Sequence, residues 1–180
     1  MLIRTPGLRM AGDEKASATA AALAVAAIAA LTLCGAWFFE YVLGIVPCPL
    51  CLEQRYAYYL LILLGVALGF AAPRGLPRGV LAAGLIIMAL AALANAGLGA
   101  YHSGVEWGFW PGPDTCSGPR VDFGKAGSLL DNLDKTKVIR CDEVQWRFLG
   151  LSLAGYNVLI SLLMAAVAIS GVASLLRRNA

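Results

Sequence analysis

Four long apolar segments constrain the fold of this chain more than any other feature of its sequence. They cover residues 18–39, 55–72, 80–101 and 155–176. A bilayer core about 30 Å thick is crossed by roughly 20 helical residues, each adding about 1.5 Å. Hydrophobic residues make up 59% of the 180 residues and charged residues 14%, more apolar than a soluble domain can bury. The sequence therefore predicts an all-α membrane protein, a four-transmembrane-helix bundle that forms one domain over residues 1–180.

Basic residues beside these segments predict the orientation of the chain. Lysine and arginine mark the cytoplasmic flanks of membrane helices. Here they precede the first segment, fill the connection between the second and third, and follow the fourth: Arg4, Arg9, Lys15, Arg74, Arg78, Arg177 and Arg178. We therefore expect both termini in the cytoplasm. The opposite face then carries a short first loop (40–54), a long second loop (102–154) and an aromatic belt.

Four of the five cysteines fall in or beside these two loops. They are Cys48, Cys51, Cys116 and Cys141, whereas Cys34 lies in an apolar run and is expected to be a small packing residue. For a bacterial inner-membrane protein the loop face is the periplasm, an oxidising compartment in which disulfides persist. The net charge of +3 is small and spread along the chain, so nothing indicates nucleic-acid binding.

Cys48 and Cys51 form a CxxC motif immediately before the second apolar segment. At the start of a helix, exposed N–H groups and the positive dipole end favour the thiolate, which is the nucleophile in disulfide exchange. Arg55 lies four residues after Cys51, on the same helical face. Its guanidinium there would stabilise a Cys51 thiolate and a negative oxygen on a bound acceptor. An interfacial arginine that only reaches the headgroups would show the same pattern.

Cys116 and Cys141 form a second pair within the long loop. A proline- and glycine-rich stretch precedes Cys116, which would leave that cysteine exposed to a partner's thiolate. Between the two cysteines, apolar residues at helical spacing predict a short amphipathic helix on the membrane surface: Phe123, Ala126, Leu130 and Leu133. The pair could be a plain loop staple or, beside a CxxC on the same face, part of an electron relay.

His102 is the only histidine and lies at the outer end of the third segment. Its charge changes near neutral pH, so it could donate a hydrogen bond to a quinone carbonyl or shuttle a proton. A histidine that is merely interfacial is an equal alternative.

In combination, these motifs resemble the bacterial disulfide bond formation protein B (DsbB) family. The matches are the CxxC with Leu50 before its second cysteine, the arginine four positions later, Tyr101-His102 ahead of a loop cysteine, and the segment 141–151, CDEVQWRFLGL. The likeness covers about residues 33–163. Pro49 inside the CxxC and Gln54 before the arginine depart from the family pattern.

The resemblance implies a function and a role for each residue. The protein would be an inner-membrane, quinone-dependent protein-disulfide oxidoreductase that reoxidises a periplasmic thioredoxin-fold (DsbA-like) oxidase. Cys116, paired with Cys141, would form the mixed disulfide with that partner, Cys48 would exchange with Cys141, and Cys51 would face a ubiquinone or menaquinone. Arg55 and His102 would lie at the quinone, which draws on the membrane quinone pool and links the protein indirectly to the respiratory chain.

Three other functions stay open at the level of sequence. A relative of vitamin K epoxide reductase also has four helices and two cysteine pairs, but there the loop pair precedes the CxxC. A metal-handling membrane protein could use the CxxC as half of a soft-metal site, although Cys116, Cys141 and His102 lack the spacing of a second ligand pair. A structural four-helix membrane protein would merely have a stapled periplasmic loop.

Overall fold

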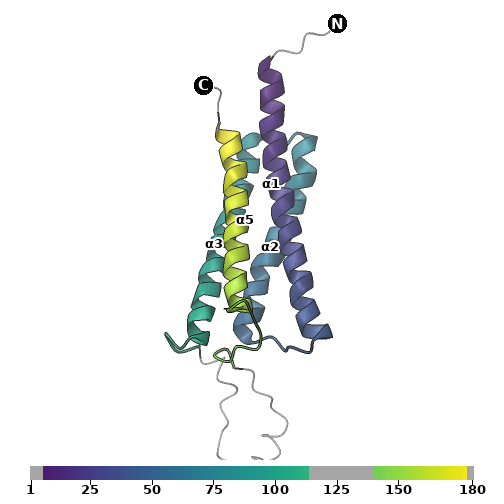
Figure 1. Ribbon diagram of the computed structural model, residues 1–180. Coiled ribbons are helices and arrows are strands. Elements are labelled where there is room, and N and C mark those ends of the chain that lie inside the picture. Colours follow the sequence, from purple (N-terminus) through teal and green to yellow (C-terminus); the bar gives the residue numbers. More distant parts are fainter. Residues whose placement is uncertain (1–5, 114–139, 178–180) are drawn as a thin grey trace, which may run out of the picture.

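The computed structural model describes residues 6–113 and 140–177, with side chains from residue 12 onward. Its main elements are four long helices arranged side by side along a common axis (Figure 1): α1 (Pro6–Trp37), α2 (Pro49–Ala71), α3 (Arg78–Glu106) and α5 (Leu153–Leu176). A π-helical turn, η1 (Phe38–Val42), extends α1, and a 3-10 turn, η2 (Ala72–Arg74), follows α2. Two short strands, β1 (Arg147–Phe148) and β2 (Leu151–Ser152), form an antiparallel hairpin before α5.

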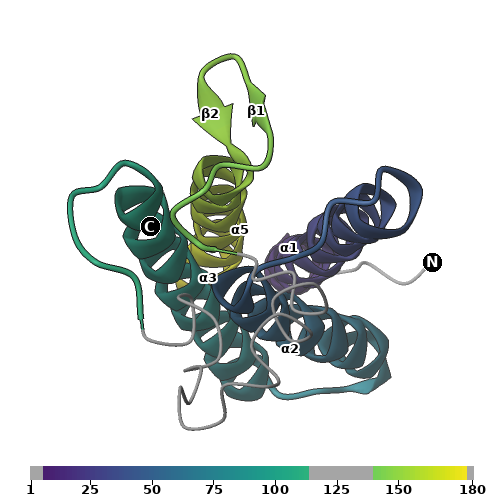
Figure 2. The ribbon, with the colours of Figure 1, turned by 90° about the horizontal axis from the view of Figure 1, so that it is seen from below.

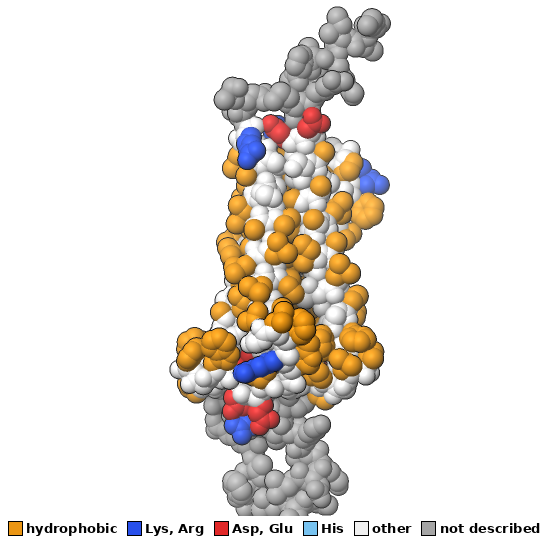
Figure 3. Space-filling view, viewed as in Figure 1, with side chains coloured by type: hydrophobic (Ala, Val, Ile, Leu, Met, Phe, Trp, Pro, Cys, Tyr) orange, Lys and Arg blue, Asp and Glu red, His pale blue; other side chains and the backbone are white. Residues whose placement is uncertain are grey.

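The four predicted spans are confirmed. Within the described residues, four helices are long and apolar enough to cross a membrane: Gly12–Val42, Pro49–Arg74, Arg78–Glu106 and Leu153–Leu176. On the face shown in Figure 3, hydrophobic side chains cover the length of the bundle and the charged ones lie near its two ends. Leu31, Leu63 and Phe70 are each more than half exposed, an arrangement suited to lipid and not to water. The protein is a multi-pass membrane protein.

The helices are longer than the apolar segments, and this changes the predicted loop boundaries. The second helix begins at Pro49 and not at residue 55, so Cys51 and Gln54 are helical. The reason is local, because a proline suits the first helical position and its lack of an N–H costs nothing there. The third helix continues to Glu106, which puts His102 on the helix instead of in the loop. The hairpin was not predicted, because strands of two residues leave no periodicity to detect.

The helices pack in a ring, with α1 against α2 and α5, and α3 against the same two helices (Figure 2). Large apolar side chains that are fully buried fill the centre: Val25, Leu61, Leu81, Leu85, Met88 and Met164. Small residues permit close approach elsewhere. A Cβ added at Gly65 would lie 2.5 Å from the carbonyl oxygen of Ala22 on α1. Close backbone approach at small residues is a common source of packing energy between membrane helices.

A buried polar cluster connects three of the helices. Tyr58 donates a hydrogen bond to Oδ1 of Asn157, which also accepts one from Asn95 Nδ2 at 3.1 Å. Asn95 Nδ2 lies 3.0 Å from Oγ of Ser161 as well. Because hydrocarbon offers no competing partners, such bonds hold α2, α3 and α5 in one register.

Both the start of α1 and the end of α5 lie at one end of the bundle (Figure 1). The connection carrying Cys48 lies at the other end, where α3 ends and the hairpin leads into α5. Figure 2 shows that hairpin projecting outward beyond α5. All described residues of the two predicted redox loops therefore share one end of the bundle.

Candidate redox site

The first cysteine pair is built into the start of α2. Cys48 is the N-cap, with φ −75° and ψ 165°, and its sulfur accepts a hydrogen bond from the backbone N–H of Cys51 at 3.3 Å. The extended backbone of Cys48 is the one favoured before a proline. Both cysteines are free thiols, and their sulfurs lie 2.8 Å apart. The geometry therefore suits the closing and opening of a disulfide between them.

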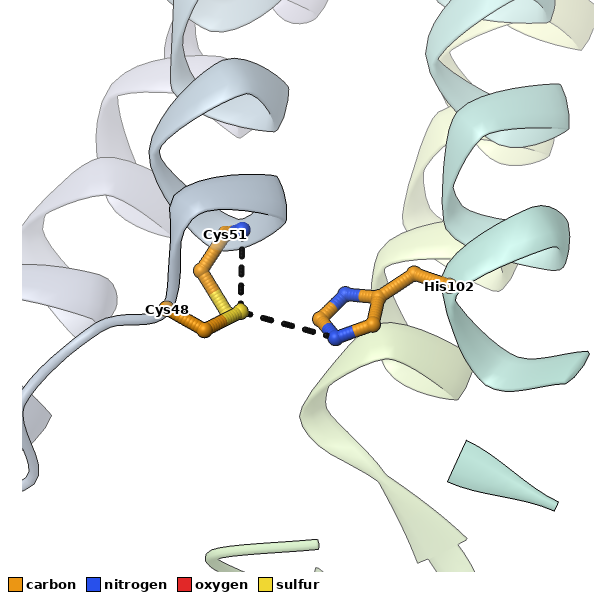
Figure 4. A group of neighbouring side chains, drawn as sticks. All are labelled: Cys48, Cys51 and His102. Atoms are coloured by element: carbon orange, nitrogen blue, oxygen red, sulfur yellow. Dashed lines mark hydrogen bonds between the residues drawn. The ribbon is translucent and has the colours of Figure 1, made fainter. Parts of the chain in front are cut away.

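His102 reaches this pair from α3. Its Nε2 lies 3.6 Å from the sulfur of Cys48, and Figure 4 shows the ring pointing from α3 toward that sulfur. The other ring nitrogen, Nδ1, lies 3.0 Å from Nε2 of Gln54. This contact leaves Nε2 of the ring to face the sulfur. His102 and Gln54 are 3% and 6% exposed, so the ring is held in place away from water.

These contacts lower the pKa of the Cys48 thiol to about 5. The largest cause is the hydrogen bond from the Cys51 side chain, and the hydrogen bond and charge of His102 add to it, while burial acts in the opposite direction. Sequence analysis placed a stabilised thiolate on Cys51, next to Arg55. The structure instead gives Cys48 the environment of a thiolate, because the Cys51 thiol and His102 both contact its sulfur.

Arg55 forms an ion pair that the sequence did not predict. Its Nη1 lies 2.6 Å from Oε2 of Glu40 on η1, and the two side chains are 13% and 22% exposed. The pair fixes the guanidinium at the margin of the cavity described below. Glu40 could not be found from sequence, because it belongs to a different helix and no spacing rule links it to Arg55.

Cys141 belongs to the same site. Cys141 is 1% exposed and packs with Cys48, Leu50 and Val105 in one buried cluster. It is disulfide-bonded. Its predicted partner Cys116 lies outside the described residues, as does the predicted amphipathic helix. The structure thus brings one member of the second pair against the first pair.

An aromatic contact holds the segment after Cys141 over the first pair. The ring of Trp146 lies 5.0 Å from that of Phe39 on η1, and it also packs against Phe148 and Tyr156. This contact joins the segment to the end of α1. It follows that the CDEVQWRFLGL segment has a structural role beside its cysteine.

A cavity of about 400 Å³ opens beside the cysteines. Its walls come from α1, α2, α3, α5 and the segment after Cys141. Most of the wall is apolar, and the polar side chains in it include Cys48, Cys51, Gln54, Arg55, Tyr58, His102, Glu106 and Asn157. The volume lies in the usual range for small-molecule sites, which combine apolar walls with a few convergent polar groups.

Ligand atoms of Cys48, Cys51 and His102 lie within 4.8 Å of one another. They are three donor atoms of the kind that zinc accepts, whereas a structural zinc site uses four ligands. Disulfide chemistry and metal handling therefore both stay open at this place, and metal analysis of the purified protein separates them.

Comparison with known proteins identifies the family. The family model described as "Disulfide bond formation protein DsbB" matches residues 18–171. The chain belongs to the DsbB family. Among curated DsbB-family proteins, all described as "Disulfide bond formation protein B", that of Verminephrobacter eiseniae is 35% identical over 164 residues, 84% of this chain and 85% of the relative. That of Marinobacter nauticus is 34% identical over 138 residues (72% and 77%), and that of Azoarcus sp. 30% over 145 residues (76% and 81%).

Membership of the DsbB family makes this chain a membrane oxidoreductase that forms disulfide bonds. No solved structure gives a significant match to the chain. The predicted site residues Cys48, Cys51, Cys141, His102 and Arg55 all lie at one end of the bundle.

Besides Glu40, two site residues escaped the sequence analysis. Gln54 was noted only as a departure from the family pattern, and the structure shows it bonded to His102. Glu106 lies one helical turn after His102 and lines the cavity. The sequence signal that could have indicated Glu106 is a charged residue four positions after a histidine on an otherwise apolar helix. Cys34, predicted to be a packing residue, is instead exposed on the outer surface of α1.

Proposed function

We propose that this protein reoxidises a periplasmic thioredoxin-fold dithiol oxidase through its two cysteine pairs and passes the two electrons to a membrane quinone. The observation that supports this most directly is the packing of Cys141 against Cys48 beside an apolar cavity. Sulfurs of two different pairs lie in one buried cluster there, which is what direct thiol–disulfide exchange between the pairs requires.

The exchange begins at the second pair. A thiolate of the reduced partner attacks Cys116, forming a mixed disulfide and releasing Cys141 as a thiolate. Cys141 then attacks Cys48 in the oxidised CxxC, so that a Cys48–Cys141 bond forms and Cys51 leaves as the thiolate. The partner's second thiol completes its own disulfide, and the released cysteine restores the Cys116–Cys141 bond. Two electrons then reside on Cys48 and Cys51.

The low pKa of the Cys48 thiol favours the last of these exchanges, in which Cys48 becomes a thiolate again. A sulfur whose pKa is about 5 leaves readily when Cys116 displaces it from Cys141. His102 stabilises the departing charge through its Nε2, which faces the sulfur. Gln54 keeps that ring in the required orientation through Nδ1. The residues around the first pair therefore favour its reduced form, in which Cys48 and Cys51 hold the two electrons.

The cavity fits a quinone. A flat apolar ring suits its largely apolar wall, and Arg55 offers a positively polarised hydrogen-bond donor for a carbonyl oxygen, whereas the ring nitrogens of His102 face Cys48, Glu106 and Gln54. Cys51 and Arg55 are the residues that would contact the ring through polar atoms, whether ubiquinone or menaquinone, and His102 would line the cavity beside it. When bound, the quinone supplies the two-electron oxidation that regenerates the Cys48–Cys51 disulfide.

We further propose that the protein lies in the bacterial inner membrane with the cysteine end of the bundle in the periplasm. Support comes from Lys15, Arg74, Arg78 and Arg177 at the opposite end, because basic flanks stay in the cytoplasm. Labelling of single-cysteine variants in spheroplasts with a membrane-impermeant maleimide tests this. Labelling of residue 116 only after the membrane is broken would reverse the orientation.

Quinone reduction by the purified full chain in lipid nanodiscs tests the activity. A reduced thioredoxin-fold oxidase is the electron donor, and the variants are Cys51→Ala and, as the matched control, Cys34→Ala. We expect loss of turnover in the first and retention in the second, since Cys34 lies on the outer surface. Unchanged turnover of Cys51→Ala would exclude the route.

The same preparation separates the alternatives left open by the sequence. Stoichiometric zinc or copper in the purified protein would favour metal handling. For a structural staple, Cys116→Ser would reduce the resistance of the protein to unfolding. For the proposed relay, Cys116→Ser would abolish oxidation of the partner and leave the folded bundle intact.

A further inference from the structure

Glu106 is a buried carboxyl group for which the exchange sequence above has no role. It is the last residue of α3, one turn after His102, and its side chain is 7% exposed. Its Oε2 is buried and has no hydrogen-bond partner among the described residues, and the Ser152 side chain is the hydroxyl that also acts on the carboxyl. Burying a carboxyl oxygen without a partner is costly, so a residue kept only for packing would not be expected to be glutamate here.

The ring of His102 connects this carboxyl to the Cys48 sulfur through one atom. Nε2 lies 3.6 Å from Sγ of Cys48 and 3.9 Å from Oε1 of Glu106, while Nδ1 is occupied by Gln54. The ring therefore lies between two acids, one at the start of α2 and one at the end of α3, and it couples their charges.

The two acids influence each other because both become negative when they ionise. In a site shielded from water, two negative groups on either side of one ring disfavour each other, and they share protons as a coupled set. While Cys48 is a thiolate, Glu106 is therefore driven toward its protonated form. When Cys48 enters a disulfide its charge disappears, and Glu106 is free to ionise.

We propose that Glu106 holds the proton given up by the Cys48 thiol while the Cys48–Cys51 pair is reduced, and releases it into the cavity when the pair is oxidised. This rests on the proposed function, which supplies the electron acceptor. In the reduced state one proton is on the Cys51 thiol and one on Glu106. When the S–S bond forms, two electrons pass to the quinone, and both protons leave for its two oxygens or for solvent.

Other ionisable groups near Glu106 have partners or face solvent. Arg55 is paired with Glu40, and Arg140 with Asp142. Besides Cys48 and His102, several ionisable groups line the cavity or act on the carboxyl through their charge. From α2 these are Cys51, Arg55 and Tyr58. From the other elements they are Arg140 and Glu143 beside Cys141, Arg147 of β1 and Tyr156 of α5. Among the described residues only His102 lies within ion-pair distance of Glu106, so the histidine is the group that links the charge of Glu106 to that of Cys48.

Infrared difference spectroscopy tests the proposal without any quinone. The full chain, freed of quinone and held in lipid nanodiscs at neutral pH, is compared in its reduced and oxidised forms. We expect a protonated-carboxyl band in the reduced form that disappears on oxidation. Glu106→Gln should lose the band, and Glu106→Asp should retain it at a shifted position. Glu143→Gln is the matched control, since it removes a carboxyl from the same cavity, and it should keep the band. A wild-type protein without the band, or a Glu106→Gln variant with it, overturns the proposal.

The redox equilibrium with glutathione gives a second readout. If Glu106 retains the proton, the reduced and oxidised sides bind equal numbers of protons, and the equilibrium constant is constant between about pH 6 and 8. Without that carboxyl the reduced protein holds one proton fewer. The equilibrium constant for its oxidation by glutathione disulfide then falls about tenfold for each unit that the pH rises. Equal slopes in wild type and Glu106→Gln would overturn the proposal. Both readouts are independent of turnover, so a failure of the quinone reaction would leave them interpretable.

Discussion

The Nε2 of His102 lies 3.6 Å from the sulfur of Cys48, although 54 positions separate the two residues in the chain. The contact joins the end of α3 to the start of α2. It places the histidine beside the cysteine whose sulfur caps α2. In the proposed exchange the sulfur with the lowest pKa leaves most easily, and there this contact would favour the departure of Cys48 as a thiolate.

Replacing His102 with alanine should raise the pKa of the Cys48 thiol. The hydrogen bond from Cys51 would remain as the largest stabilising contact, but the hydrogen bond and charge of the histidine would be lost. An opposite charge at this distance shifts a pKa by about 1–3 units. The measurement is the alkylation rate of Cys48 against pH in the reduced protein, on a Cys34→Ala background. An unchanged midpoint would show that His102 does not act on the sulfur.

The pH dependence of stability should report the same thiolate. The folded pKa of Cys48 is about 5, below the ordinary value of 9.0. Ionisation therefore favours the folded state, and its contribution is complete above about pH 9 and lost as pH falls through about 5. The reduced wild type should gain resistance to denaturation between these limits relative to Cys48→Ser. Parallel pH curves for the two proteins would contradict this assignment.

Arg55→Ala should weaken quinone binding by about tenfold. The variant loses one charge-assisted hydrogen bond, which contributes roughly 1.5–3 kcal/mol, and partial exposure to solvent reduces that contribution. Glu40→Gln should have a smaller effect in the same direction, since Glu40 fixes the guanidinium. The check is the KM for a soluble quinone analogue in both variants and in the double variant. Additive effects of the two substitutions would show that the ion pair does not position Arg55.

Asn157→Ala should destabilise the bundle. The change leaves the hydroxyl of Tyr58 and the amide of Asn95 without their shared acceptor. Hydrogen bonds between membrane helices contribute about 0.6 kcal/mol on average and up to about 1.7, so we expect a loss of roughly 1–2 kcal/mol. Unfolding in a denaturing detergent gives the value. Leu162→Ala, on the outer surface, is the control and should change little.

Gly65→Ala should be destabilising by about 1–3 kcal/mol, as overpacking of a close contact usually is. The new methyl group would lie 2.5 Å from a backbone oxygen of α1, which cannot move aside alone. Gly97→Ala is the matched control on α3, where nothing lies within 4 Å of the added carbon. Alanine should stabilise that helix by roughly 0.8–1 kcal/mol if it acts through helix propensity alone. Equal effects at the two positions would refute the packing argument.

Several properties of this protein follow from the sequence alone. The four spans are evident because hydropathy is a local quantity, and a stretch of apolar residues needs no neighbour to prefer lipid. The start of α2 is local too, since Pro49 fits the first helical position and Cys48 before it takes the extended backbone of a capping residue. The motifs that indicate the DsbB family are likewise short and contiguous.

The tertiary structure decided which distant side chains meet. Tyr58 and Asn157 are 99 positions apart, and Arg55 reaches Glu40 across the turn between two helices. Gln54, His102 and Glu106 acquire their relationship only when α2 packs against α3. Helical periodicity shows which face of a helix is apolar, but nearly every face of a membrane helix is apolar. Sequence therefore leaves open which faces pack against one another, and the fit of side chains in the bundle settles it.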